Sequence, residues 1–118
     1  MHELSIVMNV IAIAEDEAAK ANANTIEEIE LDIGRLSTVD LEAFNFAWHT
    51  AVKETILEKA LTRINDLEGK ATCPACNIEF NIDTVYEVCP SCNKSGIRIV
   101  QGQELKVKRI VLNSINPN

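Results

Sequence analysis

Apolar and polar positions in the first third of the chain follow two different periods. Between residues 5 and 22 the apolar residues recur at helical spacing, which predicts an amphipathic helix with Ser5 as its N-cap. From Glu28 to Ile33 apolar and acidic residues alternate one by one. This alternation predicts a half-buried strand that ends at Gly34. The apolar stripe of the predicted helix consists of Ile6, Val7, Val10, Ile11, Ala14 and Ala18.

A second helix is predicted to begin at Ser37 and Thr38. Ser37 is followed three residues later by Asp40, which resembles a capping box with the shorter acid, and the helix dipole also favours a carboxylate there. His49 lies within this helix, and we interpret it as a core or surface histidine rather than a metal ligand. The stripe expected to face the core is Leu41, Phe44, Ala47, Trp48 and Ala51.

The rest of the chain is predicted to form short strands. Their expected ranges are 61–67, 79–82, 84–87 and 104–112, and a loop with a helical turn is expected at 53–59. In the last strand the alternation slips between Val107 and Ile110, which predicts a β-bulge. Residues 113–118 are expected to be a frayed tail.

These elements predict an α+β fold, with two helices on a small sheet of about three strands and an inserted four-cysteine module. The last strand lies beyond the cysteines and has no sizeable partner there, so we expect it to return to the strands of the first half. One domain is therefore predicted to comprise residues 1–69 and 102–112. Residues 70–101 are predicted to form the inserted module.

All four cysteines of the chain form one CxxC…CxxC array with twelve residues between the two pairs. Each pair has the spacing of a knuckle turn, and two facing knuckles make a tetrahedral all-sulfur site, which indicates a closed structural zinc site of the zinc-ribbon type. Two disulfides or a redox motif would need an oxidising compartment or a βαβ setting, and neither is visible. Spacing alone leaves iron open in place of zinc. The four predicted ligands are Cys73, Cys76, Cys89 and Cys92.

The net charge of −7 is distributed unevenly along the chain. Residues 1–69 carry five basic and fourteen acidic side chains, whereas residues 70–118 carry six basic and four acidic ones. Four thiolates on a zinc ion bring the second half close to neutrality. A nucleic-acid-binding ribbon needs a basic face, so we expect no nucleic-acid partner.

The chain shows no nucleophile–base pair and no phosphate-binding glycine motif, so we expect no enzyme activity. Its start has no basic segment, and the apolar run from Leu4 to Ala14 is too short and too polar to span a bilayer. Reduced cysteines without a leader favour a cytoplasmic location, with no membrane partner.

The amino terminus is a second candidate metal site. The Met1 amine, the amide nitrogen of His2 and the His2 imidazole can reach one ion, and amide donors favour Ni(II) or Cu(II) over Zn(II). Glu3 can add an oxygen ligand, or it can support the ligands without contacting the ion itself. Taken alone, a histidine at position 2 is weak evidence, and an ordinary exposed terminus is the simpler reading.

Taken together, these features resemble the HypA/HybF family. The resemblance rests on Met1-His2-Glu3-Leu4-Ser5, on Ile33-Gly34-Arg35-Leu36-Ser37 leading to Phe44 and Phe46, on the four-cysteine array, and on the closing Gly-Gln-Glu-Leu-Lys-Val-Lys-Arg-Ile segment. It extends to about Leu112. The chain departs from some members in having asparagines after the knuckles, Asn77 and Asn93, where they carry histidines. An exchange of histidine for cysteine at the zinc is therefore not available within this module.

The resemblance implies a nickel metallochaperone that serves the maturation of nickel–iron hydrogenases and, in some bacteria, urease. The resemblance implies a nickel site at His2 that is assisted by the Met1 amine, with Glu3 as a participant. Asp40 is at a position where some members supply an additional nickel ligand. The four cysteines match the family's zinc ligands. Implied partners are the nickel-handling GTPase of the pathway, the hydrogenase large-subunit precursor and urease accessory proteins. The linkers around the module also leave a homodimer open.

Two rival hypotheses remain at this point. One is a zinc-ribbon adaptor that only bridges proteins and has no nickel site of its own. The weaker one is a nucleic-acid-binding ribbon, whose binding would collapse with salt.

Overall fold

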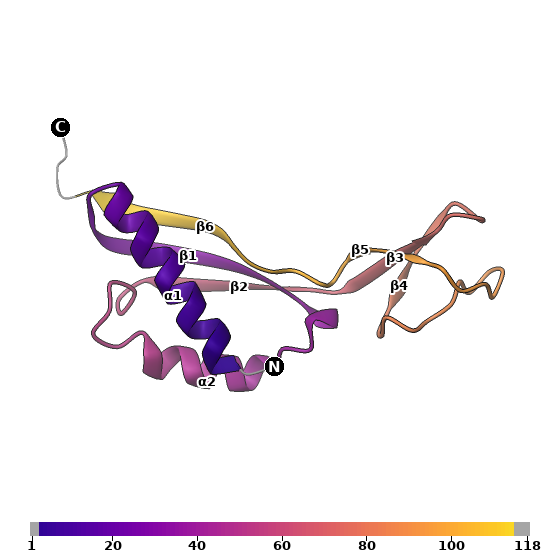
Figure 1. Ribbon diagram of the computed structural model, residues 1–118, viewed down its shortest axis with the longest axis horizontal. Coiled ribbons are helices and arrows are strands. Elements are labelled where there is room, and N and C mark those ends of the chain that lie inside the picture. The colour runs from indigo at the N-terminus through magenta and orange to yellow at the C-terminus, as the bar shows by residue number, and fades with distance from the viewer. Residues whose placement is uncertain (1–2, 115–118) are drawn as a thin grey trace. The chain divides into compact units, whose positions relative to one another are not determined.

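The computed structural model describes residues 3–114 of the 118-residue chain (Figure 1). The chain divides into two compact units. The first comprises the described residues up to Leu31, Val39–Ile64 and those from Lys106 onward; the second comprises Asp32–Thr38 and Asn65–Leu105. The predicted domain boundaries at 69/70 and 101/102 are a statement about which parts of the chain fold independently. They stay a prediction.

The first helix, α1 (Glu3–Lys20), buries the six apolar residues that the sequence predicted to face the core. Val7 and Ala14 are fully buried. The helix includes Glu3 and Leu4, so the prediction that Ser5 is its N-cap is wrong. An acidic Glu3 in the first turn suits the positive end of the helix dipole. Among the described residues no helix has the length and apolar character needed to cross a membrane.

Three strands whose residues belong mostly to the first unit form a sheet in the order β2-β1-β6. They are β1 (Ala23–Gly34), β2 (Leu61–Leu67) and β6 (Leu105–Ser114), so the last strand does return to the first half of the chain, as predicted. Glu28 of the central strand ties both neighbours together, since its Oε2 accepts hydrogen bonds from Arg63 Nε at 2.6 Å and Arg109 Nη2 at 2.9 Å.

Strand β1 begins five residues before its predicted start. Ile26 and Ile29 are both buried although they stand three residues apart, a spacing that strict alternation does not produce. Strand β6 runs to Ser114, two residues past its predicted end at Leu112, and residues 115–118 of the predicted tail lie outside the described part. The predicted bulge between Val107 and Ile110 stays a prediction.

The second helix, α2 (Leu41–Ala51), begins after a 3₁₀ turn at Arg35–Ser37. Its N-cap is Asp40, whose Oδ1 accepts the backbone N–H groups of Glu42 at 3.0 Å and Ala43 at 3.3 Å. The predicted capping box led by Ser37 is wrong, because the Ser37 hydroxyl donates to the Gly34 carbonyl at 2.6 Å instead. Phe44 and Trp48 are buried and stacked, with ring centroids 5.9 Å apart.

The second unit contains an antiparallel sheet in the order β4-β3-β5, formed by β3 (Gly69–Cys73), β4 (Ile78–Ile82) and β5 (Arg98–Gln101). The strand predicted at 79–82 is confirmed as β4. The strand predicted at 84–87 is wrong, because Glu87 Oε2 accepts the backbone N–H groups of Asp83 and Thr84 and holds the segment as a turn. Strand β5 was not predicted; it is only four residues long.

Two glycines allow the backbone of the second unit to pack closely on itself. A Cβ atom on Gly34 would lie 1.9 Å from the Gly102 carbonyl oxygen, and Gly102 has a φ of 118°. The Gly102 carbonyl accepts the Leu36 N–H at 2.7 Å. Side chains at either position would push these segments apart, so the chain leading to α2 is held at this crossing.

Candidate metal centre

Two similar turns present the four cysteines. The first, Cys73–Cys76, follows the end of β3, and the Asn77 N–H donates to the Cys73 carbonyl at 2.6 Å. The second, Cys89–Cys92, closes with the Asn93 N–H on the Cys89 carbonyl at 2.8 Å. Asn77 and Asn93 have φ values of 59° and 61°, a left-handed conformation that asparagine tolerates better than most residues.

The four sulfur atoms converge on one point, and all lie within 4.8 Å of one another. The Sγ atoms of Cys73 and Cys92 are 3.7 Å apart, and those of Cys89 and Cys76 are 3.9 Å apart. Sulfurs bound tetrahedrally at about 2.3 Å from a zinc ion stand roughly 3.8 Å apart. These separations fit a tetrathiolate site and are far longer than a disulfide bond, so none of the cysteines is paired with another.

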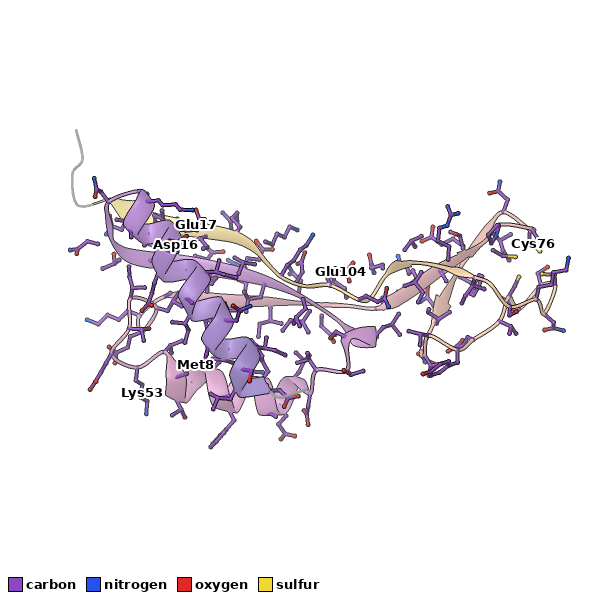
Figure 2. All side chains as sticks on the ribbon, in the orientation of Figure 1. Met8, Asp16, Glu17, Lys53, Cys76 and Glu104 are labelled. Carbon is purple, nitrogen blue, oxygen red and sulfur yellow. The ribbon has the colours of Figure 1, made fainter. Side chains whose placement is uncertain are left out.

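Burial and local hydrogen bonds make this site a closed one. Cys73 and Cys89 are buried, with exposed fractions of 3% and 0%, and the other two cysteines are half-buried. Figure 2 shows the sulfur atoms gathered near Cys76. The N–H groups of Cys76 and Ser91 approach the sulfurs of Cys73 and Cys89, each at 3.4 Å. Four ligands without an open position suit a structural ion rather than a catalytic one.

The thiols perturb one another when no cation lies between them. The neighbouring Cys92 sulfur, together with burial, raises the pKa of the Cys76 thiol to about 12. Burial also raises the pKa of Cys89, but the N–H groups of Cys92 and Ser91 outweigh it and lower that pKa to about 7. Four sulfurs this close cannot all ionise unless a cation offsets their charge. The cluster therefore favours binding of a divalent ion with loss of protons.

The amino-terminal prediction lies partly outside the described residues, because Met1 and His2 are not among them. Glu3 and Asp40 are, and they are 37 positions apart in sequence yet in contact. The Asp40 N–H donates to Glu3 Oε2 at 3.1 Å, and this hydrogen bond is the main reason that the pKa of the Glu3 carboxyl lies below its usual value. The start of α1 is thereby held against the start of α2.

Each of these two carboxylates uses one oxygen for a backbone contact. Glu3 uses Oε2 for Asp40, and Asp40 uses Oδ1 to cap α2. The sequence pattern predicted Ser37 as the capping residue and did not predict that Asp40 is the N-cap of α2. A signal for it did exist, because aspartate directly before an apolar helix is a preferred N-cap residue.

Among residues 3–114, His49 belongs to no group of converging potential ligands. Its side chain is exposed on α2, with Nδ1 2.9 Å from the Asn45 carbonyl oxygen. Within the described part of the chain, the four cysteines are the one group of three or more potential ligands whose donor atoms meet.

Comparison with known proteins identifies relatives that match nearly the full length of the chain. Residues 1–112 match the family model described as HypA, hydrogenase/urease nickel incorporation, metallochaperone. The chain is 38% identical over 112 residues to a hydrogenase maturation factor HypA of Parabacteroides distasonis, covering 95% of this chain and 97% of that protein. A Geobacter relative of the same name is 40% identical, with coverages of 95% and 99%.

Solved structures give the same result. The solution structure of the Ni metallochaperone HypA from Helicobacter pylori matches with a TM-score of 0.68 and 30% identity, covering 97% of this chain and 99% of that one. A second solution structure, of a HypA protein, matches with a TM-score of 0.69 and 31% identity. The predicted α+β fold, with two helices, a small sheet of about three strands and a four-cysteine module, is confirmed by these likenesses and by the clustered cysteines. The second three-stranded sheet was not part of the prediction.

Proposed function

This chain belongs to the HypA family of nickel metallochaperones, which are hydrogenase maturation factors and not enzymes, and we propose that it binds Ni(II) at its amino terminus and delivers it during hydrogenase maturation. Urease maturation is the second process that the family description includes. The proposal assigns nickel to the Met1 amine, the His2 amide nitrogen and the His2 imidazole. Amine, amide and imidazole nitrogens form a strong planar ligand field, which suits Ni(II) better than Zn(II).

The contact between Glu3 and Asp40 is the observation that carries this proposal. It brings together two acidic residues that are distant in the sequence, and one of them, Glu3, directly follows His2. We assign Glu3 as a supporting residue that can supply an oxygen to nickel. Asp40 contributes least, since one of its oxygens is already used as the cap of α2.

The four cysteines hold zinc in this proposal. Their separations suit a tetrahedral tetrathiolate site, as derived above, and their burial suits an ion that stays bound. Iron can bind to four sulfurs in the same geometry. Metal analysis of the purified protein distinguishes the two ions, and the proposal requires that it find zinc. The two sites then have opposite tasks, since zinc stabilises the fold and nickel is cargo that must leave.

Delivery requires partner proteins. The sequence lacks a nucleotide-binding motif, so an energy-driven step would depend on the nickel-handling GTPase of the pathway. The hydrogenase large-subunit precursor is the proposed recipient, and urease accessory proteins are the corresponding partners for urease. The four cysteines form no disulfide with one another, which is compatible with the cytoplasm as the place of action.

Calorimetric titration of untagged, zinc-loaded protein with a nickel salt tests the nickel site. The wild-type chain should bind one equivalent of nickel, and His2→Ala should abolish binding while zinc content and fold stay unchanged. A few residues added before Met1 should weaken binding almost as much, because the donor amine becomes a peptide nitrogen. Glu3→Gln should have a smaller effect and Asp40→Asn the smallest.

One result would overturn the amino-terminal site: a His2→Ala protein that binds one equivalent of nickel with unchanged affinity. If that nickel then proved to lie among the cysteines, the alternative of a zinc-ribbon adaptor without its own nickel site would gain support.

A further inference from the structure

The loop between β4 and the second cysteine pair, residues 83–88, exposes large apolar side chains. Its two ends are fixed by buried residues, since Ile82 is 4% exposed and Cys89 is fully buried. Between them Tyr86 is 89% exposed, and Val85 and Val88 are 38% and 42% exposed. The loop follows β4 in Figure 1. Three such side chains within four consecutive residues form an apolar patch that the second unit does not use for its own core.

Hydrogen bonds inside the loop hold this arrangement. Glu87 Oε2 accepts the N–H groups of Asp83 at 2.6 Å and Thr84 at 3.0 Å. The Thr84 hydroxyl accepts the N–H of Tyr86 at 3.3 Å. Because these donors are already satisfied, the loop does not have to be ordered when something binds to it, which removes one of the usual costs of association.

We propose that the 83–88 loop is a docking site for a partner protein, with Tyr86 inserting into an apolar pocket on that partner. A tyrosine combines a large apolar ring with only two side-chain torsions, and exposed aromatic anchors of this kind dominate the energy of many interfaces. Val85 and Val88 lie one and two residues from Tyr86 in the sequence, and their exposed side chains would help to exclude water around the inserted ring.

Charge identifies the kind of partner. From Ala71 to Asn93 the chain carries three carboxylates, Glu79, Asp83 and Glu87, and no lysine or arginine. The complementary pocket therefore has a rim of lysine or arginine residues. Nucleic acids and anionic lipid surfaces are repelled by the same carboxylates, and a second copy of this chain, whose net charge is −7, lacks the required sign.

Binding measurements with the two partners of the proposed function test this inference. The probes are the purified nickel-handling GTPase and the purified hydrogenase large-subunit precursor, each titrated with zinc-loaded chain. Tyr86→Ser should weaken binding to at least one of them by about tenfold or more. Val100→Ser is the matched control, since Val100 is 50% exposed on β5 of the same unit, and it should leave both affinities unchanged.

Two further variants separate the shape of the loop from its charge. Glu87→Ala removes the acceptor of two N–H groups and should weaken binding while speeding hydrogen exchange at Asp83 and Thr84, whereas Glu87→Gln keeps an acceptor and should do less to both. Asp83→Asn should slow association and reduce its dependence on salt.

The inference is overturned if Tyr86→Ser binds both probes as the wild type does, if the wild type binds neither, or if the loss appears equally in Val100→Ser. It is also overturned if Tyr86→Ser abolishes self-association and nothing else, which would make a second copy the occupant. The choice of probes rests on the proposed function. A failure of the proposed function can be distinguished from a failure of the docking site by nickel binding. Nickel titration of Tyr86→Ser should still give one equivalent.

Discussion

The two units of this chain are stabilised by different means. The first buries large apolar side chains, among them Val7, Ile29, Leu31, Phe44 and Leu57. In the second, the described residues that are buried around the cysteines are few and mostly small, namely Ala71, Ile82 and two of the cysteines themselves. We therefore expect the second unit to depend on a metal bound by the cysteines for its folding free energy, and the first unit to fold without one.

The same contrast separates the two metal sites. The cysteine site is built from four side chains of one type, partly buried and enclosed, so a bound ion should exchange slowly. The proposed nickel site lies at the chain terminus beside Glu3, a half-buried residue whose carboxylate accepts one hydrogen bond from the Asp40 N–H. A site that must release its ion benefits from being open, and one that maintains structure benefits from being closed.

Removing one cysteine should have the largest effect. Cys73→Ser leaves three sulfur ligands, and we expect the cysteine module to lose its zinc and unfold while the first unit stays largely folded. The free energy at stake is large, since structural zinc contributes about 10–16 kcal/mol in zinc-finger peptides near neutral pH. Zinc analysis together with amide NMR spectra checks this. Ser91→Ala is the control, because Ser91 serves the site only through its backbone N–H. Native module spectra with one tightly bound zinc in Cys73→Ser would contradict the prediction.

Truncating a core side chain of the first unit should destabilise that unit and leave the cysteine module intact. Phe44 is fully buried, and Phe44→Ala should lower the free energy of unfolding of the first unit by about 3–5 kcal/mol. Zinc content should not change. Phe46, two residues along the same helix, is 77% exposed, so Phe46→Ala should change the free energy by less than about 0.5 kcal/mol. Chemical denaturation of both variants measures the difference, and equal losses would mean that α2 is packed differently.

The cap of α2 should have an intermediate effect. Asp40→Ala removes the acceptor for Glu42 and Ala43 N–H and should cost about 1 kcal/mol, whereas Asp40→Asn keeps an acceptor and should cost less. Denaturation curves at neutral pH compare the two. If Asp40→Ala were as stable as the wild type, the cap would not contribute to the start of this helix.

The smallest expected effect is that of acid on the contact between Glu3 and Asp40. The Asp40 N–H lowers the pKa of Glu3 below 4.5, so the contact stabilises the fold at higher pH and is lost as pH falls through the lowered pKa. The amide proton of Asp40 should therefore shift with a midpoint below 4.5 in an NMR titration. Glu3→Gln should remove this transition, and a midpoint at or above 4.5 would show that the hydrogen bond does not favour the carboxylate.

How well each feature could be predicted depended on how local its cause is. The cysteine site was predictable because each pair is a knuckle of adjacent residues, and the core face of α1 was predictable because its spacing is regular. The segment Thr84–Glu87 contains residue types that favour strands, yet it forms a turn because the Glu87 carboxylate accepts two N–H groups that a strand would need.

The features that could not be predicted depend on distant contacts or on competition between neighbours. Strand β5 is defined by pairing with β3, with Lys70 opposite Gln101, and four residues carry too weak a pattern by themselves. Ser37 and Asp40 both suited the start of α2, and packing at the Gly34–Gly102 crossing draws Ser37 into a separate turn. The contact between Glu3 and Asp40 joins two helices and leaves no local trace in the sequence.

The most direct test of the account is the order in which the two metals leave. Untagged protein loaded with both zinc and nickel is mixed with an excess of a strong chelator, and each released metal is followed over time. We predict that nickel leaves first, from open and partly labile donors, while zinc stays in its enclosed four-sulfur site. Zinc leaving first with nickel retained would show that the two sites have been assigned to the wrong chemistry.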